Sequence, residues 1–162
     1  MKKVLLFTLS CLMISAVTIA QEEIKKPGEM KNATVDGYVN EAFGHIDTKK
    51  ALAIDLAKLE EDAKAAGVAS TSKEDATALA KRAETLEAAY TKLGEAAEAT
   101  AGKAEAASKA TADCGMKAMK CAKAVKTATK ALTSLSKGVP GDVKRATEVK
   151  VKVEALVQAT DL

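Results

Sequence analysis

The chain has 162 residues, a formal net charge of +3, two Tyr, two Phe and no Trp. Thirty-four residues are Ala and 29% are charged. This composition favours long helices, because Ala, Lys and Glu have high helix propensity. It excludes a large enclosed ligand cavity lined by aromatic side chains.

Residues 1–20 have the pattern of a cleaved signal peptide. Two lysines at residues 2–3 precede an apolar run over residues 4–17, and a small-residue cleavage signal ends at Ala20. We therefore expect cleavage before Gln21 and a periplasmic or secreted location. The alternative is an uncleaved anchor, although the run is shorter than the roughly 20 residues of a spanning helix. No later run is long enough to span a bilayer, so the mature chain should have no transmembrane segment.

Charge is unevenly distributed along the mature chain. Residues 21–102 carry 11 basic and 16 acidic side chains, a net charge of −5, whereas residues 103–152 carry 12 basic and 4 acidic side chains, a net charge of +8. The mature chain as a whole has 23 basic and 22 acidic side chains, a net charge of +1. Export, this near-neutral total and the lack of interleaved aromatic residues argue against nucleic-acid binding.

The N-terminal part of the mature chain predicts a flexible segment followed by a long helix. Residues 21–32 are polar and contain a Pro-Gly pair, which indicates flexibility. The first helix is predicted over residues 33–66, with Asn32 or Thr34 as its N-cap. Gly67 is its expected C-terminal stop.

Apolar or small residues recur with alternating spacings of three and four from residue 76 to residue 135. This unbroken seven-residue register, the seam, is typical of helices packed side by side. The helix that carries it should begin after Ser72, which resembles an N-cap followed by acidic residues. Its end is ambiguous. The register continues through residues 113–115, but this Asp-Cys-Gly triplet combines a capping residue with one that ends helices.

We predict a break at residues 113–115, which separates a second helix from a third over residues 116–137. A turn is predicted at residues 137–141, where two glycines flank a Val-Pro pair, and Asp142 is expected to cap a last helix. Residues 149–153 alternate with period two, a strand signal. No other segment reads as a partner strand, so helix is expected there.

The fold class predicted from these elements is all-α. We expect a single helical domain over residues 33–162, folded as an up-and-down bundle of about four helices. The alternative is a long helical hairpin or coiled coil with one continuous helix over residues 73–136.

Cys114 and Cys121, with Met116 and Met119 between them, form the most suggestive chemical motif. An exported chain with two mature cysteines predicts an intrachain disulfide. On a continuous helix the Cα atoms would lie about 10.5 Å apart, beyond the roughly 7 Å limit of a disulfide, so the bond requires the break at residues 113–115. An interchain disulfide and free thiols are the alternatives. A soft-metal site is disfavoured, because helical geometry places the two kinds of sulfur on opposite faces.

Five lysines lie on the side of the predicted third helix away from its apolar residues. They are Lys117, Lys120, Lys123, Lys126 and Lys130. The plain interpretation is a solvated face. The functional one is peripheral contact with an anionic surface, such as lipid head groups or polyanionic envelope polymers. A third is that these lysines face the acidic region at residues 55–62 or a second subunit.

No catalytic, cofactor-binding or metal-binding residue is predicted. His45 is the only histidine, and the chain has no covalent haem signature, phosphate-binding loop or nucleophile motif. We therefore expect no enzyme and no cofactor. The expected role is structural or protein-interacting, through self-association or an envelope protein partner. The alternative is a periplasmic binding protein for a small ligand, soft metal or lipid in a helical groove.

Overall fold

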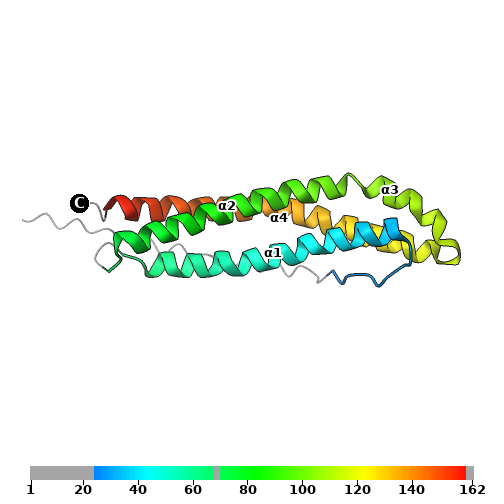
Figure 1. The fold of residues 1–162 in the computed structure, drawn as a ribbon, viewed down its shortest axis with the longest axis horizontal. Helices are drawn as coiled ribbons and strands as arrows, with labels where there is room; N and C mark the ends of the chain where they lie inside the picture. The colour runs from blue at the N-terminus through cyan, green and yellow to red at the C-terminus, as the bar shows by residue number, and fades with distance from the viewer. Residues whose placement is uncertain (1–23, 68–69, 160–162) are drawn as a thin grey trace, which may run out of the picture.

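In the computed structural model, which describes residues 24–67 and 70–159, the chain forms a long helical rod (Figure 1). The elements are α1 (Ala33–Ala65), α2 (Lys73–Ala101), α3 (Ala104–Lys109), the 3₁₀ helix η1 (Ala110–Lys117) and α4 (Ala118–Ala159). The helices α1, α2 and α4 lie side by side, while α3 and η1 close one end of the rod. No strand occurs in the described residues.

The all-α prediction is confirmed, but the four-helix bundle is not. The predicted third and fourth helices are one helix, α4, of 42 residues. The helices α2 and α4 resemble a long hairpin closed by α3 and η1, and α1 packs against both of them (Figure 1). The alternative of one continuous helix over residues 73–136 is also wrong, because α2 ends at Ala101 and Gly115 leaves the helical conformation.

The first helix agrees with its prediction to within one residue. The side chain of Asn32 caps α1 by accepting a hydrogen bond from the Val35 amide at 3.1 Å. The Asp36 carboxylate accepts the backbone amides of Met30 and Asn32 at 2.8 and 3.1 Å. Residues 24–31 have no regular secondary structure. The flexibility of residues 21–32 stays a prediction, and the signal peptide lies outside the described residues.

The second helix begins where predicted but ends earlier. The Ser72 hydroxyl accepts the Asp75 amide at 3.1 Å, which caps α2. The helix ends at Ala101 and not near residue 113, because the chain turns at Gly102 and Lys103. Gly102 favours an end to the helix here, because glycine costs about 1 kcal/mol in a helix interior.

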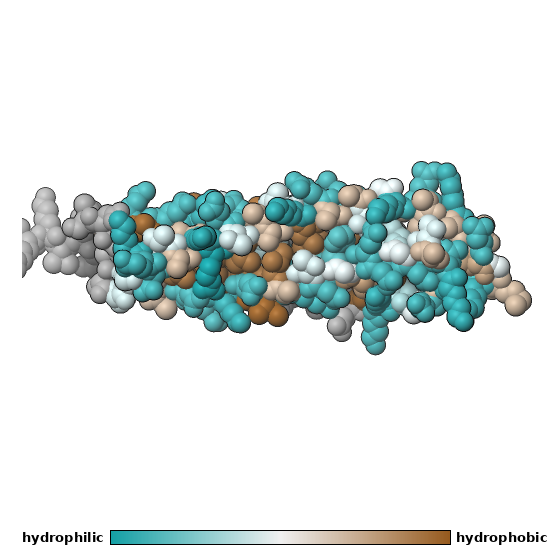
Figure 2. Space-filling view, viewed as in Figure 1, coloured by the Kyte–Doolittle hydropathy of each residue, from teal (hydrophilic) through white to brown (hydrophobic). Residues whose placement is uncertain are grey.

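The core confirms the seam as the packing surface of α2 and α4, and it is built from small residues. Nine of the 25 buried hydrophobic residues are Ala, so the helices approach closely and each contact buries little area. The seam is interrupted at the end of the rod, where η1 has no buried residue. Figure 2 shows a mostly hydrophilic face with hydrophobic side chains along the middle of the rod.

The turn predicted at residues 137–141 is wrong, because α4 continues through it with Pro140 inside the helix. Proline removes one backbone hydrogen bond, which normally ends or kinks a helix. Here the neighbouring Val139 is buried against α2, where Gly94 leaves room for it. A Cβ atom built at Gly94 would lie 3.3 Å from Val139 Cγ1. Close packing of α4 on α2 therefore outweighs the local turn signal.

Asp142 is not an N-cap. It lies inside α4, where its carboxylate is 3.2 Å from the Lys49 ammonium and 3.7 Å from the Arg145 guanidinium. The strand-like segment that follows is helical, as expected, and places Val149 and Val153 in the core. Within the described residues, no helix has the length and hydrophobicity needed to cross a bilayer.

Candidate functional site

The end of the rod is closed by a disulfide between Cys114 and Cys121, which delimits the tip loop (residues 114–121). The two Cα atoms lie 6.7 Å apart, much closer than on a continuous helix. Gly115 brings them together with φ 55° and ψ −128°. Side chains other than glycine rarely adopt a positive φ, so this position needs a glycine. The break at residues 113–115 is therefore the feature that allows the disulfide.

Met116 and Met119 project from the tip loop into solvent. Their relative exposures are 107% and 88%, the largest among the exposed large hydrophobic residues. Cys121 is fully buried and faces the core. The methionine side chains and Cys121 therefore lie in opposite environments, solvent and core.

The predicted lysines extend from the tip loop along α4. Lys117 and Lys120 lie inside the tip loop, and Lys123, Lys126 and Lys130 follow on the first turns of α4. All five are exposed, and none forms an ion pair within the described residues. The five lysines thus lie on the exposed surface from the tip loop into α4, and two of them are sequence neighbours of the exposed methionines.

The predicted alternative, in which the lysines face residues 55–62, does not match the structure. Residues 55–62 lie near the end of α1 that is farther from the tip loop (Figure 1). Two of their carboxylates are paired with other cations, Asp62 with Arg82 at 2.7 Å and Glu60 with Arg145 at 2.9 Å. Two of the four carboxylates in residues 55–62 are therefore paired with cations of α2 and α4 and not with the five lysines.

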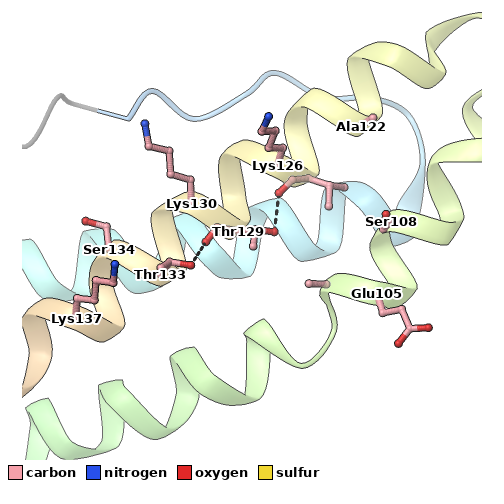
Figure 3. A pocket seen from close by; sticks show the side chains of 11 residues that line it. Glu105, Ser108, Ala122, Lys126, Thr129, Lys130, Thr133, Ser134 and Lys137 are labelled. Atoms are coloured by element: carbon pink, nitrogen blue, oxygen red, sulfur yellow. Dashed lines mark hydrogen bonds between the residues drawn. The ribbon is translucent and has the colours of Figure 1, made fainter.

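An open groove of about 810 Å³ lies beside the tip, lined by residues of α3 and α4 (Figure 3). Its basic members Lys126, Lys130 and Lys137 extend to one side of α4, away from the labelled Glu105. No sequence pattern predicted this groove, because it depends on how α3 lies relative to α4.

Two of the hydroxyl groups that line the groove already form hydrogen bonds within the fold. Thr129 donates to the Val125 carbonyl at 2.9 Å and lies 2.8 Å from the Tyr38 hydroxyl, and Thr133 donates to the Thr129 carbonyl at 3.0 Å. Two of the groove's polar groups are therefore committed to the fold.

A second group of polar and charged side chains lies between α1, α2 and α4. We call it the central polar cluster, and it consists of Lys49, Glu60, Tyr90, Asp142 and Arg145. The Arg145 guanidinium donates two hydrogen bonds to Glu60, at 3.0 and 2.9 Å. This pairing raises the pKa of Arg145. Desolvation, followed by the nearby charge of Asp142, raises the pKa of Tyr90 to about 12.

Two atoms of the central polar cluster are buried without a hydrogen bond in the described part of the chain, the Tyr90 hydroxyl and Asp142 Oδ2. The Lys49 ammonium lies 3.2 Å from Asp142 Oδ2, so the carboxylate has a charge partner without an aligned donor. A neutral phenol with so high a pKa is a poor base at neutral pH. The ion pairs of the cluster connect α1 to α4.

His45 lies at a contact between α1 and α2. Its Nε2 atom is 2.9 Å from the Thr100 hydroxyl, which also lies 3.4 Å from Glu41. The Lys103 ammonium donates to Glu41 at 2.7 Å, and this hydrogen bond lowers the pKa of Glu41. These contacts fasten the end of α2 to α1.

Among residues 24–67 and 70–159, no group of three or more His, Cys, Asp and Glu side chains is placed to hold a metal ion. The tip loop is the surface feature with the most distinctive chemistry, although the sequence pattern pointed to its lysines and cysteines more than to its methionines.

No family model matches the chain, and neither a curated protein nor a solved structure matches it.

Proposed function

We propose that the chain is an exported, alanine-rich helical protein of the cell envelope, periplasmic or secreted, that docks on an envelope component through its tip loop. One observation carries this proposal, the exposure of Met116 and Met119 beside exposed lysines. Exposed apolar groups rimmed by polar residues are typical of interaction sites. Burying a methionine stabilises a complex by about 1.5 to 3 kcal/mol.

The disulfide supports both the location and the role. Disulfides persist in oxidising compartments, which agrees with the signal-peptide pattern of residues 1–20. It also fixes Met116 and Met119 on a closed loop, so less conformational entropy is lost on docking.

Docking on another component is favoured over self-association. A stable protein interface uses about 20 to 30 residues on each side. The tip loop has eight residues, from Cys114 to Cys121. A contact between two tips would be too small for a stable dimer.

The test is co-sedimentation of the purified protein with an envelope fraction from its own source. We expect Met116→Gln/Met119→Gln to reduce binding at least tenfold, since it removes both exposed apolar groups. The matched control is Ile54→Gln/Val151→Gln, because these two residues are each 59% exposed outside the tip loop. The control should bind as the unmodified protein does. Equal binding by all three proteins, or no binding by any, would contradict the proposal.

A second candidate function is binding of a small anionic ligand in the groove beside the tip. Its volume of about 810 Å³ lies within the usual range of ligand pockets, and Lys126, Lys130 and Lys137 supply positive charge. Native mass spectrometry of protein purified from its own compartment would show a bound mass that disappears in Lys126→Gln/Lys130→Gln. Absence of any bound mass would remove this candidate.

A further inference from the structure

We infer that the occupant of the tip loop is an anionic lipid bilayer, into which Met116 and Met119 insert while the neighbouring lysines contact lipid phosphates. This inference rests on the proposed docking function and names its partner. The step from docking to lipid follows from the shape of the tip, the arrangement of its side chains and their charge.

The shape of the tip suits a fluid surface. The tip loop is at the end of a long rod (Figure 1), and its methionines are almost wholly exposed. Protein hot spots instead fill packed pockets surrounded by a ring of further contacts. A bilayer needs no complementary pocket, because its lipids move around an inserted side chain. The unbranched, flexible methionine side chain suits such an irregular environment.

The side chains that would insert into the bilayer are exposed, whereas the one that anchors the loop is buried in the core. Met116 is near the end of η1 and Met119 is in the first turn of α4, and both side chains are almost wholly exposed. Lys117 and Lys120 each follow one of these methionines in the sequence and are also exposed. Cys121 is buried on the core side. The disulfide therefore ties the loop to the rod on one side while the methionines project on the other.

The charge of the tip selects an anionic surface over a neutral one. From residue 113 to residue 130 the chain carries five lysines and one carboxylate, that of Asp113. The long side chain of a lysine can reach the head-group level while apolar neighbours insert. Each lysine near an anionic leaflet strengthens binding about fivefold. Burial of apolar side chains and electrostatic attraction to anionic lipids both strengthen peripheral binding, and the tip loop supplies both.

Vesicle co-sedimentation tests the contribution of each group. The probes are vesicles of phosphatidylcholine containing phosphatidylglycerol, and vesicles of phosphatidylcholine alone. We expect the protein to prefer the anionic vesicles. Met116→Gln/Met119→Gln should reduce that binding at least tenfold, and Lys117→Gln/Lys120→Gln about twenty-fivefold at low salt. The control Ile54→Gln/Val151→Gln should leave it unchanged.

Fluorescence reports insertion directly, because the chain has no Trp. Met119→Trp places a single indole on the tip loop, and Val151→Trp places one outside it. We expect a blue shift with anionic vesicles for Met119→Trp and none for Val151→Trp. Cys114→Ser/Cys121→Ser, with its helix content checked by circular dichroism, should bind more weakly, since its loop is no longer fixed.

The outcomes distinguish this inference from the function on which it rests. If anionic vesicles do not bind, or if Met119→Trp shows no shift, the bilayer inference is wrong. If the envelope fraction still binds in a Met116- and Met119-dependent way, docking stands with a protein or polymer partner. If only the lysine variant weakens vesicle binding, the contact is electrostatic and insertion is wrong. If neither vesicles nor the envelope fraction depends on the tip, both proposals fail.

Discussion

Two glycine-containing segments of the chain carry similar local signals and adopt opposite structures. Residues 113–115 combine Asp with Gly, and residues 137–142 combine two Gly, Pro and Asp. The first segment breaks the helix at Gly115, whereas the second lies within α4. The segment with the stronger turn composition is the one that stays helical.

The difference lies in what surrounds each segment. The middle of α4 has Leu135, Val139 and Ala146 buried against the other helices. The 3₁₀ helix η1, which contains Gly115, has no buried residue. Tertiary packing thus overrides local preference in the middle of the rod, while local preference decides the structure at the tip.

The largest expected effect comes from removing packing in the middle. Leu135→Ala should lower the free energy of unfolding by about 2 to 5 kcal/mol, because Leu135 is 1% exposed and its loss leaves a cavity. Met119→Ala at the tip should change it by less than about 0.5 kcal/mol. Urea denaturation followed by circular dichroism measures both. Comparable losses in the two variants would show that the tip is packed like the core.

The next effect depends on pH and belongs to the central polar cluster. The pKa of Tyr90 is raised from 10.0 to about 12 in the folded chain. Folding therefore favours the protonated phenol, a contribution that is complete below pH 10 and lost as the pH rises from 10 to 12. Two pKa units correspond to a loss of about 2 to 3 kcal/mol. Urea denaturation at several pH values from about 9 to about 12 measures this loss, because that range includes both pKa values of Tyr90.

Tyr90→Phe isolates this contribution from the titration of the lysines. The variant should lose less stability than the unmodified protein as the pH rises above 10, since it lacks the phenol. At neutral pH it should be at least as stable, because the hydroxyl is buried without a hydrogen bond in the described residues. Parallel pH profiles for the two proteins would mean that the phenol titrates normally.

The sequence predicted those elements whose signals were local and unopposed. The Asn32 and Ser72 caps and the break at Gly115 were found because side-chain or backbone chemistry within a few residues decides them. The seam was found because periodicity reports which face of a helix is buried.

The missed features depend on contacts between distant residues. The continuity of α4 depends on Gly94, which lies 45 residues before Val139 and leaves room for it. The pairing of Arg145 with Glu60 joins residues 85 positions apart. The early end of α2 lies where Lys103 and Thr100 meet Glu41 of α1. The exposure of the two methionines depends on the direction in which α4 leaves the disulfide.

The smallest expected effects test the comparison of the two glycine-containing segments most directly, because they come from the same substitution, glycine to alanine, in each segment. Gly115→Ala should destabilise the chain by about 1 to 2 kcal/mol, since Gly115 has a φ of 55° that L-residues avoid. Gly141→Ala should stabilise it by about 0.4 to 1 kcal/mol, because alanine favours the helix and its Cβ would meet no atom within 4 Å. Urea denaturation gives the sign of the stability change for both variants, and intact mass under non-reducing conditions shows whether Gly115→Ala also hinders the disulfide.

If both substitutions stabilised the chain, the backbone at residue 115 would be helical and the tip loop would lose its physical basis. If both destabilised it, the turn signal at residues 137–141 would still be expressed in the folded chain.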